Sequence, residues 1–184
     1  MLAHVRSDLV LETKRCRLRQ STASESASIL RAVTDPRYPQ DDTWSDVLTE
    51  ADARSRLASQ LERWESNEAY HFSVELSRTS EFLGQVSLAR EPEPNTWLLG
   101  YWIAPERWGL GLATEVAAEA VRFATASLGA RSIWAGTTPD NHRSRRVLEK
   151  LRFEFRNENP CGYQLRGADV ATLEFELTDL MGAV

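Results

Sequence analysis

The sequence predicts one α/β (α+β) domain in which a mixed, mostly antiparallel sheet is flanked by helices. Residues 70–76 and 82–88 are two strand-like runs joined by a short polar link, as in an antiparallel hairpin. Residues 96–138 contain a strand, a glycine turn, a helix and another strand, the order of a parallel crossover unit. The 184 residues suffice for one hydrophobic core. We expect a single domain over 1–184, with its core at about 9–178.

Composition sets further bounds on function. A content of 42% hydrophobic and 27% charged residues is typical of a globular protein in water. The net charge of -5 disfavours a nucleic-acid surface and suits a cationic partner. Cys16 and Cys161 occur without a CxxC pattern or a histidine cluster, so no disulfide framework and no metal site is predicted. Without a secretory signal or an apolar run of ~18 residues, a cytoplasmic protein with no membrane partner is expected.

The first elements are a strand, a helix and a loop. Residues 9–18 have a charged interruption and predict one bent or bulged edge strand. A helix over about 25–33 follows, and hydroxyl residues just upstream offer N-caps for it. Residues 34–46 contain two prolines and four aspartates, which predict a loop. That loop is either a solvated connection or the rim of an amine site walled by Tyr38 and Trp44.

A second helix precedes the predicted hairpin. Thr49, with Asp52 three residues later, resembles a capping box and predicts a helix from Thr49 to about Glu65. One apolar stripe of this helix consists of Ala53, Leu57, Leu61 and Trp64. Gly84 and Gly100 lie inside later strands, where glycine marks a bulge or a close approach of two backbones.

A glycine-rich turn joins the central strand, 96–103, to the following helix. Gly109 and Gly111 precede residues 112–128, whose apolar side chains recur at helical spacing, and Gly129 is placed as the C′ residue. Glycines leave backbone N–H groups uncovered at the helix N-terminus, and such a terminus attracts phosphate. The stretch therefore predicts a diphosphate-binding turn.

The remaining chain completes the sheet. Residues 131–138 predict a strand parallel to the central one. The next helix has Asp140 or Asn141 as its cap, with inward side chains at Val147, Leu148 and Leu151. Residues 153–156 and 170–177 predict late strands separated by a polar loop.

Three phosphate ligands compete for the glycine turn. A Walker-type nucleotide loop is excluded because GK(S/T) is missing. A dinucleotide fold would need GxGxxG, but Thr114 stands at the third glycine, no acidic ribose contact is evident, and the preceding strands look antiparallel. Coenzyme A is the third ligand, and it is favoured by motifs elsewhere in the chain.

The chain resembles the GNAT superfamily of N-acetyltransferases, and within it the RimJ/RimL branch of ribosomal-protein N-terminal acetyltransferases. Residues 108–113, WGLGLA, match the cofactor motif Q/R-x-x-G-x-G/A, in which this branch commonly begins with Trp. Residues 141–153, NHRSRRVLEKLRF, match the second motif. FLGQVSL and LLGYWIAPERW match the third and fourth strands, and the resemblance extends from LETKRCRLR to LEFEL.

This resemblance implies a splayed GNAT-like sheet that binds acetyl-CoA and transfers the acetyl group directly to a primary amine. The implied catalytic groups are Ser144 as an acid for the leaving thiolate, Asn141 as both N-cap and cofactor contact, and a main-chain N–H near Ile103 as oxyanion donor. The implied cofactor-binding residues are Trp102, Ile103, Ala104, Trp108, Gly109, Leu110, Gly111, Leu112, Ala113, Thr114, Asn141 and Ser144. Three cations either bind phosphate or are merely solvated, namely Arg145, Arg146 and Lys150.

The general base and the acceptor stay open. The family position for a base corresponds to Cys161, Tyr163 or Gln164, and the other candidates are His71, Glu75, Asp41 and Asp42. An α-amine, with a pKa of about 8, needs less help than a lysine amine at about 10.4. A protein N-terminus is therefore the expected acceptor, with an antibiotic, amino acid or polyamine as the alternative.

The sequence is also compatible with other classes of protein. A non-catalytic acyl-CoA sensor and a dinucleotide-dependent enzyme are the alternatives of a different class, and a homodimer is the assembly left open. Arg152 replaces the glycine of the family's KLGF. If this position has positive φ, the side chain costs on the order of 1 kcal/mol.

Overall fold

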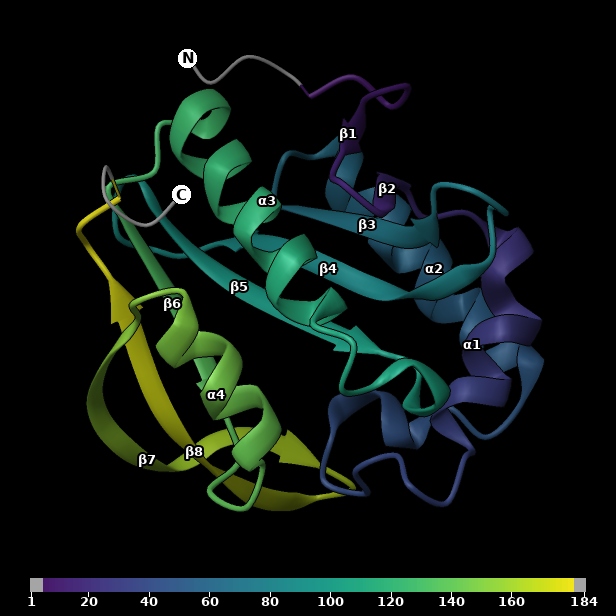
Figure 1. Cartoon of the computed structure of the whole chain (residues 1–184). Coiled ribbons are helices and arrows are strands. Elements are labelled where there is room, and N and C mark those ends of the chain that lie inside the picture. Colours follow the sequence, from purple (N-terminus) through teal and green to yellow (C-terminus); the bar gives the residue numbers. More distant parts are fainter. Residues whose placement is uncertain (1–4, 181–184) are drawn as a thin grey trace.

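An eight-stranded mixed sheet forms the centre of the computed structural model, which describes residues 5–180 (Figure 1). The strand order is β1-β2-β3-β4-β5-β6-β8-β7, and β5 and β6 form the parallel pair among antiparallel neighbours. The strands are β1 (Val10–Glu12), β2 (Cys16–Gln20), β3 (Ala69–Leu76), β4 (Phe82–Arg90), β5 (Thr96–Ile103), β6 (Ser132–Thr137), β7 (Glu154–Leu165) and β8 (Ala168–Leu177). The helices are α1 (Ser26–Val33), α2 (Glu50–Glu65), α3 (Leu112–Leu128) and α4 (His142–Lys150), with short 3-10 turns η1 (Ala23–Glu25), η2 (Thr43–Asp46) and η3 (Pro105–Arg107). The predicted fold class is confirmed.

Helices cover both faces of this sheet. Figure 1 shows α3 and α4 in front of the sheet and α1 and α2 on its other side. Small and apolar side chains let α3 pack closely on β4 and β5, and its fully buried residues are Val116, Ala117, Ala120, Val121, Ala124 and Leu128. Within the described residues, no helix is long and apolar enough to cross a membrane.

The connection at residues 34–46 is packed against the core, which excludes the solvated interpretation. Tyr38 and Trp44 are buried in a second cluster with side chains of α1, α2 and β5. Part of the segment forms η2, whose N-cap is Asp42. The two aromatic side chains thereby hold the segment beside the end of β5.

Residues 9–18 form two strands, so the prediction of a single bent strand is wrong. β1 and β2 pair antiparallel around a turn at 13–15. Glu115 of α3 holds that turn: it accepts hydrogen bonds from Thr13 Oγ1 at 2.6 Å, from Arg15 N at 2.7 Å and from Arg15 Nε at 2.6 Å. The charged interruption forms a turn because Glu115, about a hundred residues later in the chain, accepts hydrogen bonds from Thr13 and Arg15.

The polar stretch predicted as a loop between the late strands is strand as well. β7 extends over Glu154–Leu165 and pairs with β8 as a long hairpin. Most β7 side chains are exposed, because this is an edge strand with solvent on both faces. Such a strand has no apolar alternation for a sequence pattern to detect.

The buried stripe of α2 differs by one position from the prediction. Leu61 is 41% exposed, whereas Gln60 is 7% exposed and faces the sheet. Gln60 is tolerated there because its side-chain amide exchanges two hydrogen bonds with that of Gln85 on β4. The predicted start of α2 is confirmed, since Thr49 and Asp52 form a capping box.

The backbone at Gly84 makes the predicted close approach, and Arg152 has the positive φ considered for it. A Cβ on Gly84 would lie 2.1 Å from the carbonyl oxygen of Trp102, so β4 and β5 approach closely there, opposite a register shift in β3. At Gly100 the β4–β5 register is continuous, which excludes a bulge. Arg152 has φ 62°, so this chain retains the left-handed turn after α4 with a non-glycine residue.

Candidate active site

Strands β5 and β6 separate partway along their length. They pair only from Thr96 opposite Ser132 to Leu98 opposite Trp134. Beyond Leu98, β5 keeps its pairing with β4 while its other edge faces an opening. The splayed sheet implied by the resemblance is present.

The hydrogen-bond pattern shows which β5 groups face the opening. Glu91 N donates to Thr96 O at 3.0 Å and Ala104 N donates to Leu83 O at 2.7 Å, so even-numbered residues of β5 bond to β4. Alternation in an antiparallel pair then directs the N–H and C=O groups of Leu99, Tyr101 and Ile103 away from β4. Of the three backbone positions expected to meet the cofactor arm, only Ile103 presents its N–H to the opening.

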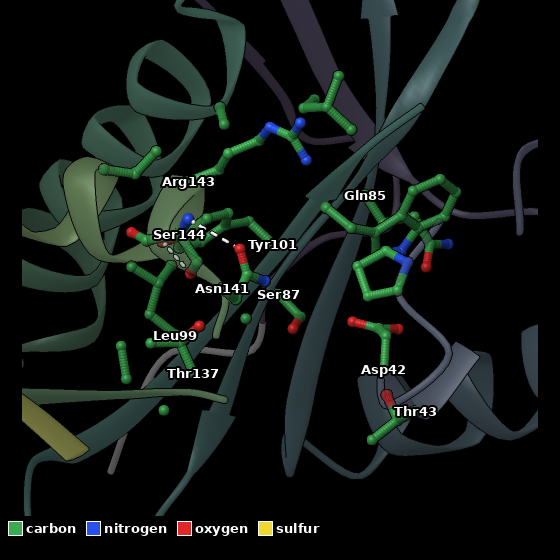
Figure 2. A pocket seen from close by; sticks show the side chains of 18 of the residues that line it. Asp42, Thr43, Gln85, Ser87, Leu99, Tyr101, Thr137, Asn141, Arg143 and Ser144 are labelled. Carbon is green, nitrogen blue, oxygen red and sulfur yellow. Dashed lines mark hydrogen bonds between the residues drawn. The ribbon is translucent and has the colours of Figure 1, made fainter. Parts of the chain in front are cut away.

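A cavity of about 1030 Å³ occupies the opening and continues to the segment at residues 38–44 (Figure 2). Side chains and backbone from β4, β5, β6, the start of α3 and one face of α4 line it. Its dimensions fall in the range of small-molecule and cofactor sites. Most of the residues expected at the site meet here, although they come from distant parts of the chain.

The glycine turn closes one end of the cavity. Gly109 has φ 77° and Gly111 has φ 74°, conformations that favour glycine, and Gly111 is the N-cap of α3 without a capping side chain. Gly109 and Gly111 line the cavity together with Leu112, Ala113 and Thr114. Leu110 is 53% exposed and does not line it. The turn therefore presents backbone rather than side chains to a ligand.

Trp108 ties this turn to the end of β5. Its indole Nε1 donates a hydrogen bond of 2.6 Å to the carbonyl oxygen of Ile103. The guanidinium of Arg143 stacks 4.5 Å from the Trp108 ring centroid. The strand, the turn and α4 are thus held together around the cavity. Trp102 and Ile103 line this cavity, whereas Ala104 does not.

Three cations of α4 line the same region. Arg143, Arg146 and Lys150 are three and four residues apart, so they share one helix face. Arg145 lies off this face and does not line the cavity. The sequence interpretation missed Arg143, although helical spacing from Arg146 and Lys150 would have found it.

Asn141 and Ser144 lie at the start of α4, facing β5. Asn141 is the N-cap, with its Oδ1 accepting a hydrogen bond of 3.1 Å from Ser144 N. Ser144 Oγ lies 2.9 Å from the hydroxyl of Tyr101, which sequence reasoning counted only as a strand residue. Burial raises the pKa of Tyr101 above its usual range, so this phenol is neutral near neutral pH.

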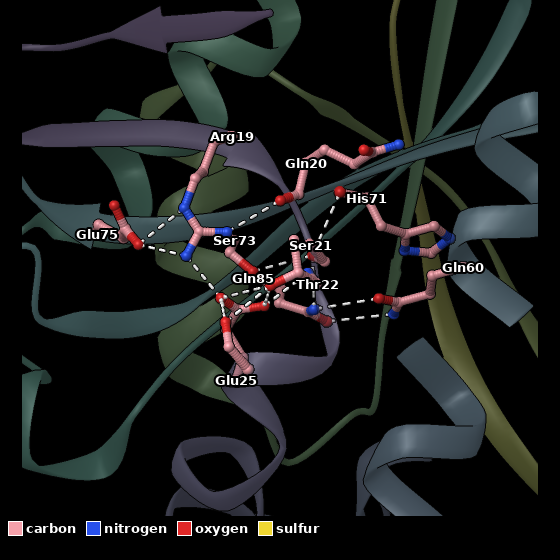
Figure 3. A network of polar contacts seen from close by, with 11 residues as sticks. Arg19, Gln20, Ser21, Thr22, Glu25, Gln60, His71, Ser73, Glu75 and Gln85 are labelled. Carbon is pink, nitrogen blue, oxygen red and sulfur yellow. Dashed lines mark hydrogen bonds and ion pairs between the residues drawn. The ribbon is translucent and has the colours of Figure 1, made fainter. Parts of the chain in front are cut away.

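The other end of the cavity holds the candidates for acceptor binding. Asp41, Asp42, His71 and Tyr163 line it, whereas Glu75, Cys161 and Gln164 do not. Glu75 instead accepts a hydrogen bond of 2.9 Å from Arg19 Nε (Figure 3). Burial, assisted by the charge of Arg63, lowers the pKa of His71 to about 4. Burial raises the pKa of Asp42 above its usual range.

The α4 wall and the segment that carries Asp41 and Asp42 contribute opposite charges to the cavity. Glu91, Glu174 and Arg107 also line it, while the charged residues that α4 contributes are all cations. An anion is favoured beside α4 and a cation beside the two aspartates. Among residues 5–180, no cluster of three or more His, Cys, Asp or Glu could hold a metal ion.

A helix N-terminus without a capping side chain, an unpaired strand edge and a cationic helix face are together suited to bind a phosphorylated carrier of an acyl group. The chain belongs to the acetyltransferase (GNAT) domain family, whose model matches residues 15–154.

Individual relatives agree with this family. The chain is 34% identical over 110 residues to the probable N-acetyltransferase YjcK of Bacillus subtilis (strain 168), a match covering 59% of this chain and 61% of that protein. A putative ribosomal-protein-serine acetyltransferase from Vibrio cholerae has a TM-score of 0.85 at 22% identity, covering 95% of this chain and 99% of that one. RimJ of Mycobacterium smegmatis, solved with CoA-disulfide, has a TM-score of 0.81 at 20% identity, covering 96% and 90%. At these identities the two structures show the shared fold.

Proposed function

We propose that this chain binds acetyl-CoA and transfers the acetyl group directly to a primary amine, with a protein N-terminal α-amine as the acceptor. The observation that carries the proposal is the continuous groove formed by the free edge of β5, the glycine turn and the cationic face of α4. A long, flexible, phosphorylated thioester fits such a groove from end to end. The solved structure of RimJ with CoA-disulfide supports the choice of cofactor.

The chain's own groups divide the work of cofactor binding. Backbone N–H groups at the start of α3 bind the diphosphate, because the helix dipole and the missing cap both favour an anion there. Arg143, Arg146 and Lys150 neutralise phosphate charge. The amides of the pantetheine arm pair with Leu99 and Tyr101 as an added strand would, because the carbonyl of Ile103 already accepts from Trp108 and its N–H is left for the reacting group.

The reaction forms one C–N bond and breaks one C–S bond. The neutral amine attacks the thioester carbonyl, and the N–H of Ile103 donates to the developing oxyanion. Ser144 donates a proton to the departing thiolate and is reprotonated by the proton that the amine nitrogen loses, so the products are the amide and the free thiol. Neutral His71, whose pKa is about 4, is a weak base. An α-amine with a pKa of about 8 is partly neutral without a strong base.

A small polycationic amine is the second candidate acceptor. The carboxylates of Asp41 and Asp42 at the acceptor end would suit a polyamine. A non-catalytic sensor would keep the cofactor groove but show no acceptor turnover.

Turnover and binding measurements separate these functions. CoA release is measured with acetyl-CoA and a panel of N-terminal peptides, amino acids, antibiotics and polyamines, with mass detection of the acetylated products. Acetylated peptide N-termini are the expected products. Acetyl-CoA binding without turnover on any amine in the panel or in a cell extract would favour the sensor. Binding of NAD but not of acetyl-CoA would overturn the proposed function.

A further inference from the structure

The acceptor end of the cavity contains a buried hydrogen-bond donor that the fold does not use. Trp102 is only 9% exposed, it lines the cavity, and its indole Nε1 has no hydrogen-bond partner. Its ring is fixed by Tyr38, Trp44 and Phe82, with centroid separations of 5.9, 5.8 and 5.8 Å. An unmade hydrogen bond in a buried site costs free energy, so a fixed donor of this kind indicates a missing acceptor atom.

The polar side chains of Gln60 and Gln85 beside Trp102 have hydrogen-bond partners, unlike the indole. Gln85 and Gln60 exchange hydrogen bonds of 3.1 and 3.2 Å, and Gln85 Nε2 also donates to Ser21 Oγ at 2.9 Å (Figure 3). His71 Nε2 is the other unpartnered side-chain atom on this wall. The unpaired indole N–H of Trp102 thus lies opposite Gln85, whose own hydrogen bonds are made.

A carboxyl group with a free oxygen belongs to the same recess. Asp42 Oδ1 accepts hydrogen bonds of 2.8 Å from both Tyr38 OH and Trp44 N, and neither bond uses Oδ2. Tyr38 and Trp44 contact both Asp42 and the Trp102 ring, so the carboxylate and the indole belong to one aromatic cluster that lines the cavity. Figure 2 shows Asp42 on one side of the strand ribbons and Tyr101 and Ser144 on the other.

These two groups define the chemistry of a ligand. Asp42 accepts hydrogen bonds and attracts a cation, while Trp102 Nε1 can only donate. An α-amino group with its adjacent carbonyl offers a donor nitrogen and, three bonds away, an acceptor oxygen. A polyamine offers only donors, and a lysine side chain has no acceptor near its amine, so either would leave the indole unpaired.

We propose that Asp42 and Trp102 form a subsite for the first residue of the acceptor, with Asp42 accepting a hydrogen bond from its α-amino group and the Trp102 indole donating to its carbonyl oxygen. The proposal rests on the proposed acetyltransferase function and narrows it. It makes the enzyme selective for α-amines that carry an adjacent carbonyl, namely peptide N-termini and amino-acid amides. The preference comes from the penalty on acceptors that leave a buried donor unpaired.

The test compares a short peptide with its analogue in which the first carbonyl is replaced by methylene. The wild-type enzyme should acetylate the natural peptide with a kcat/KM roughly tenfold or more above that of the analogue, as expected for one buried hydrogen bond. Trp102→Phe should reduce this ratio to near one. Asp42→Asn should lower kcat/KM for both acceptors while acetyl-CoA affinity stays unchanged. Trp134→Phe, which changes another tryptophan lining the cavity, is the matched control and should keep the wild-type ratio.

The outcomes separate the subsite from the overall function. No turnover of any amine by the wild-type enzyme would overturn the acetyltransferase proposal itself. Turnover with no preference for the carbonyl, or an unchanged preference in Trp102→Phe, would overturn the subsite alone. If Trp102→Phe does not fold, the indole N–H resonance of Trp102 is followed by NMR during titration with the peptide. A downfield shift that the methylene analogue does not cause supports the subsite, and no shift overturns it.

Discussion

The hydroxyl oxygen of Tyr101 lies 2.9 Å from Ser144 Oγ and 3.1 Å from the carbonyl oxygen of the same residue. A phenol has one proton to donate, so two arrangements are available. When Tyr101 donates to Oγ, the serine proton is free to point into the cavity. When Tyr101 donates to the carbonyl, the serine proton points back at the phenol. Tyr101 is thereby a positioning residue for the proposed acid.

Removal of this hydroxyl pair should slow the chemical step. Ser144→Ala should lower kcat by roughly 100-fold, the lower range for one general acid, with little effect on KM for acetyl-CoA. Tyr101→Phe should lower kcat less, by roughly tenfold, because water can still orient Ser144. Since the two residues act as a unit, the double variant should be no slower than Ser144→Ala. Full activity of Ser144→Ala would show that Ser144 has only a structural role in the first turn of α4.

The glycine turn predicts a specific loss of cofactor affinity. Gly111→Glu should raise the Kd for acetyl-CoA by at least about 100-fold, because a carboxylate would stand where the diphosphate binds. A negative side chain is favourable at a helix N-terminus, so α3 itself should still form. Isothermal titration calorimetry measures the affinity.

Two alanine variants control for backbone strain. Gly111 and Gly129 have φ values of 74° and 66° at opposite ends of α3. Gly111→Ala and Gly129→Ala should each cost about 1 kcal/mol of unfolding free energy. If Gly129→Ala weakened acetyl-CoA binding as much as Gly111→Glu does, strain in α3 rather than the turn would explain the loss.

Elements specified by local patterns could be predicted from the sequence. The limits of α3 follow from an apolar stripe that ends at Gly129, and β3 and β4 follow from alternation on either side of a polar link. Asn141 could be assigned as an N-cap because capping depends on neighbours three residues away. The same motif placed Ser144 at the cavity.

Features that depend on distant partners could not be predicted. The turn at 13–15 is held by Glu115, and Tyr101 gains its role from Ser144 across the splay. β7 has no apolar pattern because both its faces meet solvent. The acceptor recess exists only because the segment 34–46 folds back onto Trp102. No periodicity within one segment encodes such contacts.

The β7–β8 turn should control acceptor binding through contacts with the segment that carries Asp42. Arg166 Nε donates to Asp46 Oδ1 at 2.8 Å and its Nη2 donates to Ser45 O at 2.7 Å, while Tyr163 OH donates to Asp41 O. Because the ion pair is partly exposed, it is worth up to about 1 kcal/mol. Arg166→Ala should therefore raise KM for a peptide acceptor about three- to fivefold, with the Kd for acetyl-CoA unchanged.

A matched surface arginine controls for the loss of charge. Arg54 forms an exposed ion pair with Glu50 within α2, so Arg54→Ala should leave both constants at wild-type values. An equal rise of KM in both variants would attribute the effect to net charge. A rise in the Kd for acetyl-CoA in Arg166→Ala would contradict a role limited to the acceptor.

His71 should make the stability of the protein depend on pH. Burial holds the pKa of His71 at about 4 in the folded protein, whereas an unfolded chain has a histidine pKa of about 6.5. Between these values the unfolded chain binds a proton that the folded protein lacks, so unfolding free energy falls as pH decreases. The loss should reach about 2 kcal/mol by about pH 5 and level off below about pH 4. Urea unfolding at about pH 7 and pH 5 measures this loss.

Carboxylates add their own pH dependence to the unfolding free energy, so His71→Gln is compared with wild type. His71→Gln should remove the part of the pH dependence that comes from His71. His142→Gln, at the exposed start of α4, is the matched control and should keep it. An equal loss of unfolding free energy for wild type and His71→Gln would mean that folding does not lower the pKa of His71.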